Sequence, residues 1–236
     1  MKSSEALGDF SEPEKYDALL NSGVGLSGEN RDYFLKGRVK DLKHQLPDGF
    51  VPTRILDYGC GTGESSQLLA QVFSSARVVG SDLSEETIAY ARSRYEEPSV
   101  QFCTVPNLPT SSSFDLCYCN GVFHHIPPDE RSGVLRSIRA ILRPGGCFAL
   151  FENNPWNPGT RLIMKRIPFD RDAQTLSPRH AHRLLGRSGF SVSRPRFLFY
   201  FPRPLSWFRP LETNLVRLPL GAQYWLLGRV QSATNS

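Results

Sequence analysis

The segment that most constrains the fold is an apolar stretch that runs directly into three alternating glycines. It spans residues 55–64 and reads ILDYGCGTGE. A short, continuously apolar run is typical of a strand that is buried on both faces. Glycines at this spacing let the backbone turn tightly against a ligand before a helix begins near Glu64. Because open parallel sheets bind ligands at the carboxyl ends of their strands, we expect a ligand site at this turn.

Strand-like and helix-like segments alternate along the chain that follows. The apolar segments are 54–57, 77–80, 100–103, 114–119 and 147–151, and the helical segments are 65–73, 85–95 and 129–142. Short apolar strands separated by helices predict an α/β protein of the doubly wound type. We therefore expect a mostly parallel sheet with helices on both faces.

We treat the chain as one domain in three parts, because 236 residues can bury one full core. Residues 1–50 are predicted to form an N-terminal helical cap, since Leu35, Val39 and Leu42 share one helical face. Residues 51–152 form the ligand-binding core. Residues 153–236 are predicted to be an insertion followed by the closing strands of the same domain.

Composition narrows the class of protein further. Charged residues make up 22% of the chain and hydrophobic residues 39%, which is normal for a globular protein. No long apolar run and no apolar signal segment is present, so we expect a cytoplasmic protein. The cysteines at 60, 103, 117, 119 and 147 form no CxxC pair. They indicate buried thiols in a reducing compartment, and we expect no metal site.

Basic residues are concentrated in the last third of the chain. From Arg161 onward the sequence contains 13 Lys and Arg residues but only three Asp and Glu residues. This balance is compatible with an acidic substrate, a nucleic acid, an anionic membrane surface or a solvated Arg-rich face. The same region contains the aromatic segments 199–204 and 207–209. For these we favour packing of the final strands over contact with an anionic acceptor or a membrane.

The glycine segment resembles the first motif of the class I S-adenosylmethionine-dependent methyltransferases, written D/ExGxGxG. The match runs from Asp57 to Gly63 and is complete. A dinucleotide fingerprint, GxGxxG, does not fit in either register, since the third glycine is replaced by Glu64 or Ser66. The resemblance implies S-adenosylmethionine as the cofactor and a Rossmann-like sheet of seven strands.

The same resemblance assigns roles within the first motif. Asp57 is expected near the amino group of the cofactor's methionine, by direct or water-mediated contact. Gly59, Gly61 and Gly63 are expected to let the backbone approach the cofactor. Cys60, in the same loop, is included in the predicted cofactor site.

Three further segments match the family in order. The strand at 78–82 ends in Asp82, whose carboxylate can bind both ribose hydroxyls, with Leu83 beside it. The segment 114–126 resembles the family's fourth strand, which places Asn120 near the cofactor, and 141–146 resembles the turn before strand five. Many members carry an acid after strand three that binds adenine. Here Thr104 takes that position, and the backbone of Val105 is expected to help.

Methyl transfer needs a base only when the acceptor is protonated, and histidine suits that task near neutral pH. His125 and His124 follow the fourth strand and face the expected cleft, although a histidine here can also organise the loop. Glu152, at the end of strand five, is the third candidate as base or substrate anchor. Tyr16, Tyr33 and Arg38 are placed near the acceptor pocket, where a packing role is equally compatible.

We thus predict a methyltransferase that acts on a small-molecule or saccharide acceptor, which can be anionic, by in-line transfer to oxygen or nitrogen. Two alternatives stay open. One is an RNA methyltransferase whose Arg-rich C-terminal third holds phosphates. The other is a cofactor-binding regulatory protein that transfers no methyl group. The sequence does not fix the oligomeric state.

Overall fold

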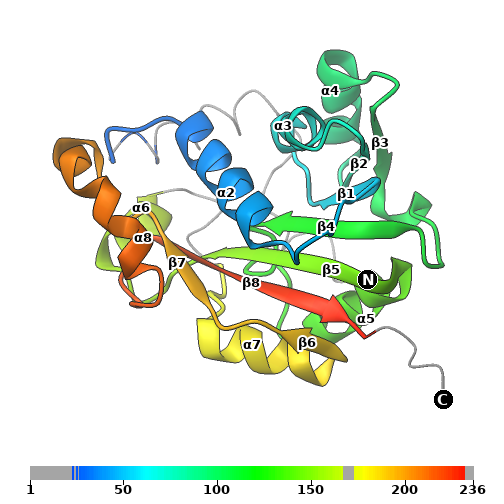
Figure 1. Cartoon of the computed structure of the whole chain (residues 1–236). Helices are drawn as coiled ribbons and strands as arrows, with labels where there is room; N and C mark the ends of the chain where they lie inside the picture. The colour runs from blue at the N-terminus through cyan, green and yellow to red at the C-terminus, as the bar shows by residue number, and fades with distance from the viewer. Residues whose placement is uncertain (1–22, 24, 26, 167–172, 232–236) are drawn as a thin grey trace.

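A single sheet organises the chain, in a computed structural model that describes residues 23, 25, 27–166 and 173–231. Its strands are β1 (Arg54–Tyr58), β2 (Arg77–Asp82), β3 (Val100–Thr104), β4 (Phe114–Asn120), β5 (Leu142–Asn153), β6 (Phe190–Val192), β7 (Arg196–Leu198) and β8 (Gln223–Val230). Their order is β3-β2-β1-β4-β5-β8-β6, with β7 also paired to β8 (Figure 1).

The expectation of a seven-stranded, mostly parallel sheet is confirmed, with one difference in detail. Strands β1 to β5 pair in parallel, whereas β8 is antiparallel to β5. The sheet has eight strands, because β6 and β7 pair with different halves of β8. Because these two short strands lie end to end along β8, they together occupy the seventh and last strand position of the sheet.

Helices cover both faces of the sheet, as the alternation predicts. They are α2 (Arg31–Gln45), α3 (Glu64–Val72), α4 (Glu85–Tyr95), α5 (Arg131–Ile141), α6 (Pro158–Arg166), α7 (Pro178–Arg187) and α8 (Glu212–Leu215), with 3-10 helices η1 (Val105–Asn107) and η3 (Arg203–Leu211). In Figure 1, α2, α3 and α4 lie above the sheet, and α5 and α7 lie below it. The sequence pattern did not indicate α6 or η3.

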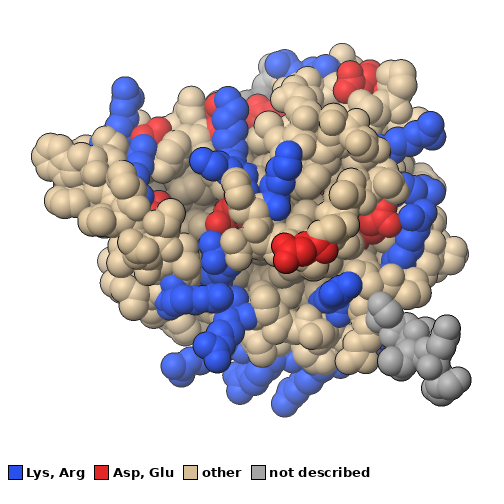
Figure 2. Space-filling view, in the orientation of Figure 1, with Lys and Arg blue, Asp and Glu red and all other residues tan. Residues whose placement is uncertain are grey.

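Basic residues dominate one edge of the face seen in Figure 2. Along the lower edge, where α7 lies in Figure 1, the coloured side chains are all Lys or Arg. Among the described residues, no helix is both long and apolar enough to cross a bilayer.

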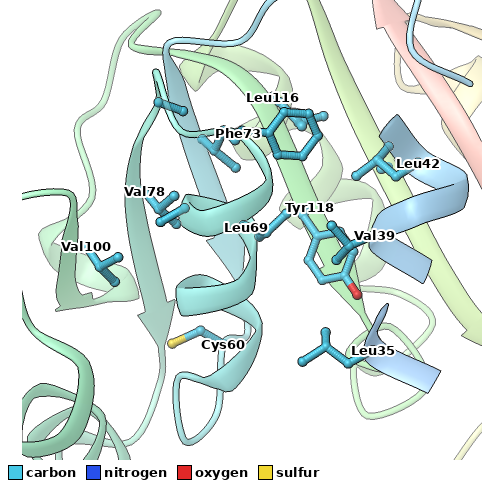
Figure 3. Close-up of a cluster of buried hydrophobic side chains, with 14 of the residues drawn as sticks. Leu35, Val39, Leu42, Cys60, Leu69, Phe73, Val78, Val100, Leu116 and Tyr118 are labelled. Carbon is cyan, nitrogen blue, oxygen red and sulfur yellow. The ribbon is translucent and has the colours of Figure 1, made fainter. Parts of the chain in front are cut away.

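The helical face predicted near the N-terminus lies in α2. Asn30 caps this helix by accepting a hydrogen bond from the backbone N–H of Tyr33. Leu35, Val39 and Leu42 are buried and point toward α3 and β4 (Figure 3). The helix therefore forms one wall above the carboxyl ends of the central strands. The domain boundaries at 50 and 152 stay a prediction.

Candidate functional site

A cavity of about 570 Å³ opens at the carboxyl ends of β1 and β4. Its walls come from α2, the glycine turn after β1, the loop after β4, α6 and the segments 199–202 and 222–223. The insertion after β5 thus contributes α6 to the cavity. Tyr33 and Arg38 line it as expected, whereas Tyr16 lies outside the described residues.

The glycine turn has the backbone geometry that its sequence predicts. Gly59, Gly61 and Gly63 have φ angles of +73°, +53° and +92°, a region that side chains rarely adopt. The N–H groups of Gly59 and Cys60 both donate to the carbonyl of Ser81 on β2, at 2.7 and 2.9 Å. A Cβ on Gly61 would have no heavy atom within 4 Å. The backbone at Gly61 therefore leaves room for a ligand at the cavity wall.

Asp57, the acid of the motif, is a buried cavity residue. Its side chain is 1% exposed, and one carboxylate oxygen accepts hydrogen bonds from Ser65 and Ser66 at 2.6 and 2.7 Å. Burial raises the pKa of Asp57 from 3.8 to about 6, against the two serine hydrogen bonds, which lower it. A cationic ligand group beside Asp57 would therefore stabilise the ionised carboxylate.

Arg38 of α2 brings a buried cation to the same cavity. It is 9% exposed; its Nε donates to the Tyr118 hydroxyl at 3.1 Å, and its Nη1 donates to Gln223 at 3.0 Å. Its positive charge lowers the pKa of Asp57, although no ion pair joins the two side chains. A carboxylate and a guanidinium that share a cavity without pairing are complementary to a zwitterionic amino-acid group.

Asp82 lies at the end of β2, beside the glycine turn. Its two carboxylate oxygens accept from the backbone N–H of Gly61 at 3.0 Å and of Ser84 at 3.2 Å. Ser84 caps α4 by accepting from the N–H of Thr87, so Asp82 is not the helix cap. Each carboxylate oxygen keeps lone pairs for further donors. Binding of ribose by Asp82 stays a prediction.

The predicted adenine contacts are neighbours of Asp82 in the sheet. Thr104 is paired with Asp82 in the β2–β3 register, and its hydroxyl accepts from Asn107 at 2.9 Å. Val105 begins η1, and Leu83 is 60% exposed. These residues lie beyond the cavity walls. The structure therefore brings the predicted nucleoside residues together at one edge, next to the cavity that holds Asp57.

Asn120 closes β4 and lines the cavity. Its Oδ1 atom is buried and has no hydrogen-bond partner among the described residues. Leaving a buried acceptor unsatisfied costs about 1–3 kcal/mol, so such an atom indicates a position where a ligand donates. The contact of Asn120 with the cofactor, which the fourth-strand motif implies, stays a prediction.

His124 and Glu152 form a buried pair on the inner side of the loop after β4. The Nδ1 atom of His124 lies 2.6 Å from Oε2 of Glu152, and the two side chains are 4% and 1% exposed. The other oxygen of Glu152 accepts from the backbone N–H of Phe123 at 2.8 Å. His124 lines the cavity but Glu152 does not. This geometry suits a carboxylate that orients His124 and anchors the loop.

His125 is the more accessible of the two histidines. It is half-buried, lines the cavity, and its ring centroid lies 4.1 Å from that of His124. A role as general base for either histidine, or for Glu152, stays a prediction. Within the described residues, no group of three or more His, Cys, Asp or Glu side chains is placed to hold a metal ion.

An aromatic wall lies across the cavity. The sequence indicates Tyr33 and the segment 199–204, but it indicates neither Phe34 nor the contact between these segments. The ring of Phe199 packs on Tyr33 and Phe34, with centroids 5.8 and 4.8 Å apart. Phe199 has a φ of +63°, a left-handed conformation that costs an aromatic residue free energy. Its ring fills the space beside Gly37, where a Cβ would come within 2.6 Å of the ring. The glycine at position 37, inside α2, was the one feature of the sequence that could have indicated this close approach.

Comparison with known proteins agrees with this geometry. Residues 55–146 match a family model described as a methyltransferase domain, which spans the glycine turn, Asp82, Asn120 and both histidines. Residues 55–146 are therefore similar to a methyltransferase domain, which agrees with their resemblance to the class I S-adenosylmethionine-dependent methyltransferases.

Curated relatives match part of the chain. A trans-aconitate 2-methyltransferase of Variovorax paradoxus (strain S110) is 35% identical over 112 residues, which are 47% of this chain and 42% of that protein. A relative of the same name from Escherichia coli O1:K1 / APEC is 28% identical over 156 residues, 64% of this chain and 61% of that protein. These alignments span less than two thirds of either relative.

Solved structures share the fold over more of the chain. A methyltransferase from Mesorhizobium loti has a TM-score of 0.61 at 22% identity, covering 83% of this chain and 99% of that one. The magnesium protoporphyrin IX methyltransferase of Synechocystis PCC 6803 has a TM-score of 0.59 at 21% identity, covering 84% and 82%. At these identities the likeness establishes the Rossmann-like fold.

Proposed function

We propose that this chain transfers the methyl group of S-adenosylmethionine to a small-molecule acceptor. The observation that carries the proposal is the pair of opposite charges, Asp57 and Arg38, buried in one cavity beside the glycine turn. An amino-acid ammonium would satisfy Asp57, and an amino-acid carboxylate would satisfy Arg38. The unpartnered Oδ1 of Asn120 offers an acceptor for a third polar group.

The residues that would hold the cofactor fall into two groups. Asp57, Arg38, Asn120 and the turn at 59–61 surround the amino-acid part. Asp82, with Leu83, Thr104 and Val105, is assigned to the nucleoside part at the adjoining edge. Relatives with this fold were crystallised with S-adenosylmethionine or S-adenosylhomocysteine, which supports the same cofactor here.

Methyl transfer depends more on alignment of the acceptor with the methyl group than on acid–base catalysis. When bound, the cofactor supplies a methyl group on a positively charged sulfur. The chain's task is to bring the acceptor in line with that group and to exclude water, because alignment and desolvation lower the barrier. His125 would accept the acceptor's proton where there is one, with His124 held in place by Glu152.

The charges around the cavity favour an acceptor with few anionic groups. Arg31 pairs with Glu64 at 3.3 Å, and Glu29 pairs with Arg209 at 2.7 Å, so these charges are largely compensated. Arg166 of α6 also lines the cavity and is exposed, so it offers one cation to an acidic group of the acceptor. The aromatic wall offers an apolar surface of the kind that binds flat or hydrophobic groups. A small acceptor with an apolar body and at most one acidic group fits this lining better than the tricarboxylate named for the curated relatives.

A reducing, cytoplasmic location accords with the cysteines. All five, including the buried Cys117, Cys119 and Cys147, are free thiols. Protein thiols persist where glutathione and thioredoxin keep them reduced.

The proposal is tested by calorimetric titration of S-adenosylmethionine into the wild type and two variants. We expect Asp82→Ala and Gly61→Val each to lower affinity at least about tenfold, by loss of the ribose contact and by a side chain placed in the ligand's space. Asp48→Ala, an exposed acid at the opposite end of the sheet, serves as the control and should bind normally. Unchanged affinity in both site variants would show that the nucleoside is misplaced.

Turnover is a separate question from binding. Incubation with methyl-labelled cofactor and a panel of acceptors, including trans-aconitate, hydroxylated aromatic acids, saccharides and RNA, should give label only on a small molecule. Label on RNA, or tight cofactor binding with no transfer to any acceptor, would favour the RNA methyltransferase or the regulatory protein.

A further inference from the structure

Exposed apolar side chains are concentrated in one region of the chain. Ten large hydrophobic residues are exposed among those described, and eight of them lie between positions 156 and 220. Four belong to η3, and we call them the aromatic tip: Leu205, Trp207, Phe208 and Leu211, which are 40%, 74%, 42% and 50% exposed. Single exposed apolar residues are ordinary, but such a group within nine residues indicates an interaction site.

The aromatic tip stands away from the body of the protein. In Figure 1, η3 and α8 project at the upper left, beyond the N-terminal end of α2, and no residue of η3 is buried. Figure 2 shows the same projection as a largely uncharged surface. The packing expected for the aromatic segments 199–204 and 207–209 holds for Phe199, whose ring packs on Tyr33 and Phe34. It does not hold for Trp207.

The tip is continuous with the wall of the cavity. Phe201 lines the cavity, and its ring centroid lies 5.5 Å from that of Phe208. The ring of Phe208 in turn contacts that of Trp207 edge to face at 5.7 Å. An unbroken row of aromatic rings therefore leads from the cavity to the most exposed apolar side chain of the tip.

The few charged side chains near the tip are mostly basic. Among the described residues from Asn153 onward, Glu212 is the only acid. Its carboxylate faces inward, where it accepts from the backbone N–H groups of Tyr200 and Phe201 at 3.0 and 2.9 Å. Arg209 of η3 is balanced by Glu29, at 2.7 Å. Arg203 and Arg217 are exposed in the same part of the chain, and no salt bridge joins either to an acid of the described residues. The surface thus combines apolar side chains with unbalanced basic ones, which is the complement of an anionic lipid surface.

We propose that the aromatic tip docks on an anionic lipid bilayer and sets the mouth of the cavity at the bilayer surface. Trp207 and Phe208 enter the interfacial layer, where amphipathic aromatic rings are favoured, while the arginines contact the headgroups. Exposed leucines argue for lipid rather than RNA, because phosphates and bases give aliphatic side chains little to bind. The docking itself does not depend on methyl transfer; delivery of a hydrophobic acceptor from the bilayer to the cavity rests on the proposed function.

Vesicle co-sedimentation of the full chain tests the docking. The probes are vesicles of phosphatidylcholine alone and of phosphatidylcholine mixed with phosphatidylglycerol. We expect binding to the mixed vesicles that weakens as salt is raised, and little binding to phosphatidylcholine alone. The double variant Trp207→Ser, Phe208→Ser should lower the partition coefficient at least about tenfold, since each ring contributes apolar area. Val51→Ser makes a similar change at a 70% exposed residue just before β1 and should bind like the wild type.

Fluorescence adds a measurement that reports on the tip itself. Of the three tryptophans, Trp207 is 74% exposed, Trp156 44% and Trp225 1%. Trp207 is the one in the aromatic tip, so vesicle binding should shift its emission to shorter wavelength, and Trp156→Phe should leave that shift in place. Trp207→Phe should keep binding and lose most of that shift. Equal circular dichroism spectra for all variants establish that they are folded.

Three outcomes would overturn the proposal. One is undiminished vesicle binding by the double serine variant. Another is equal affinity for neutral and anionic vesicles. The third is absence of binding to the mixed vesicles. If the protein then forms a dimer by gel filtration that the double variant loses, the tip is covered by a second copy.

Discussion

Replacing Asp57 by asparagine should stabilise the protein without ligand while it impairs cofactor binding. Burial moves the pKa of Asp57 from 3.8 to about 6. At about 1.4 kcal/mol per pH unit, the ionised carboxylate then costs the folded state about 3 kcal/mol at pH 7 and above. Asparagine has nearly the same shape and carries no charge, and its side-chain oxygen can accept from Ser65 and Ser66.

The sign follows from the raised pKa. Between pH 4 and pH 6 the folded protein holds a proton on Asp57 that the unfolded chain has released. The contribution of this group to stability is therefore fully present below pH 4 and is lost as the pH rises through 6. Asp57→Asn should match the wild type near pH 4 and exceed it by about 2–3 kcal/mol at pH 7.5.

Urea unfolding of both proteins without ligand, at several pH values from 4 to 8, measures this difference. Subtracting one curve from the other removes the carboxylates that the two proteins share, provided that their m-values agree. A variant that is less stable than the wild type at pH 7.5, or a difference that does not change with pH, would refute the reasoning. Calorimetry at pH 7.5 should show that the same variant binds S-adenosylmethionine at least about tenfold more weakly.

Two further predictions concern the walls of the cavity. His124→Ala leaves the buried carboxylate of Glu152 without its partner, so we expect a loss of about 3 kcal/mol in urea unfolding, largely recovered by the second change Glu152→Gln; a loss under 1 kcal/mol would mean that the pair does not hold the loop. Gly37→Ala brings a methyl group within 2.6 Å of the ring of Phe199, so we expect a loss of about 1–3 kcal/mol and weaker binding of apolar acceptors. Phe199→Leu in the same protein should restore part of that stability, and no recovery would place the clash elsewhere.

The sequence predicted that Asp57, the three glycines and Asp82 come together at one edge of the sheet, because these residues are local in the chain. One turn joins Asp57 to the three glycines, and the next strand ends in Asp82 beside them. Backbone sterics and strand pairing alone put these groups together. The resemblance supplied the seven positions of the sheet, and the apolar runs supplied the five parallel strands.

Contacts between distant segments could not be predicted in the same way. Phe199 packs against Gly37 of α2, and His124 pairs with Glu152 from another strand. Each contact depends on tertiary packing that no periodicity encodes. The left-handed backbone of Phe199 contradicts the local preference of an aromatic residue. Tertiary contacts stabilise it, because the next two backbone N–H groups donate to the carboxylate of Glu212. The missed features are therefore those of the acceptor side.

The two sides of the cavity differ for a physical reason. On the cofactor side, burial of the ionised Asp57 lowers the stability of the protein without ligand. A cationic amino group would offset this loss on binding. The lost stability of the free protein thus reappears as affinity for the ligand.

On the proposed acceptor side, aromatic rings at 4.8–5.8 Å spacing give an apolar surface, Arg31 and Glu29 are neutralised by their own partners, and Arg166 of α6 is an exposed cation of the cavity wall. Under the proposed function, charge would select the methyl donor, and apolar shape would dominate the choice of acceptor. An acceptor chosen in that way is one that water dissolves poorly, and the aromatic row from Phe201 to Trp207 leads it to the kind of surface where such molecules gather.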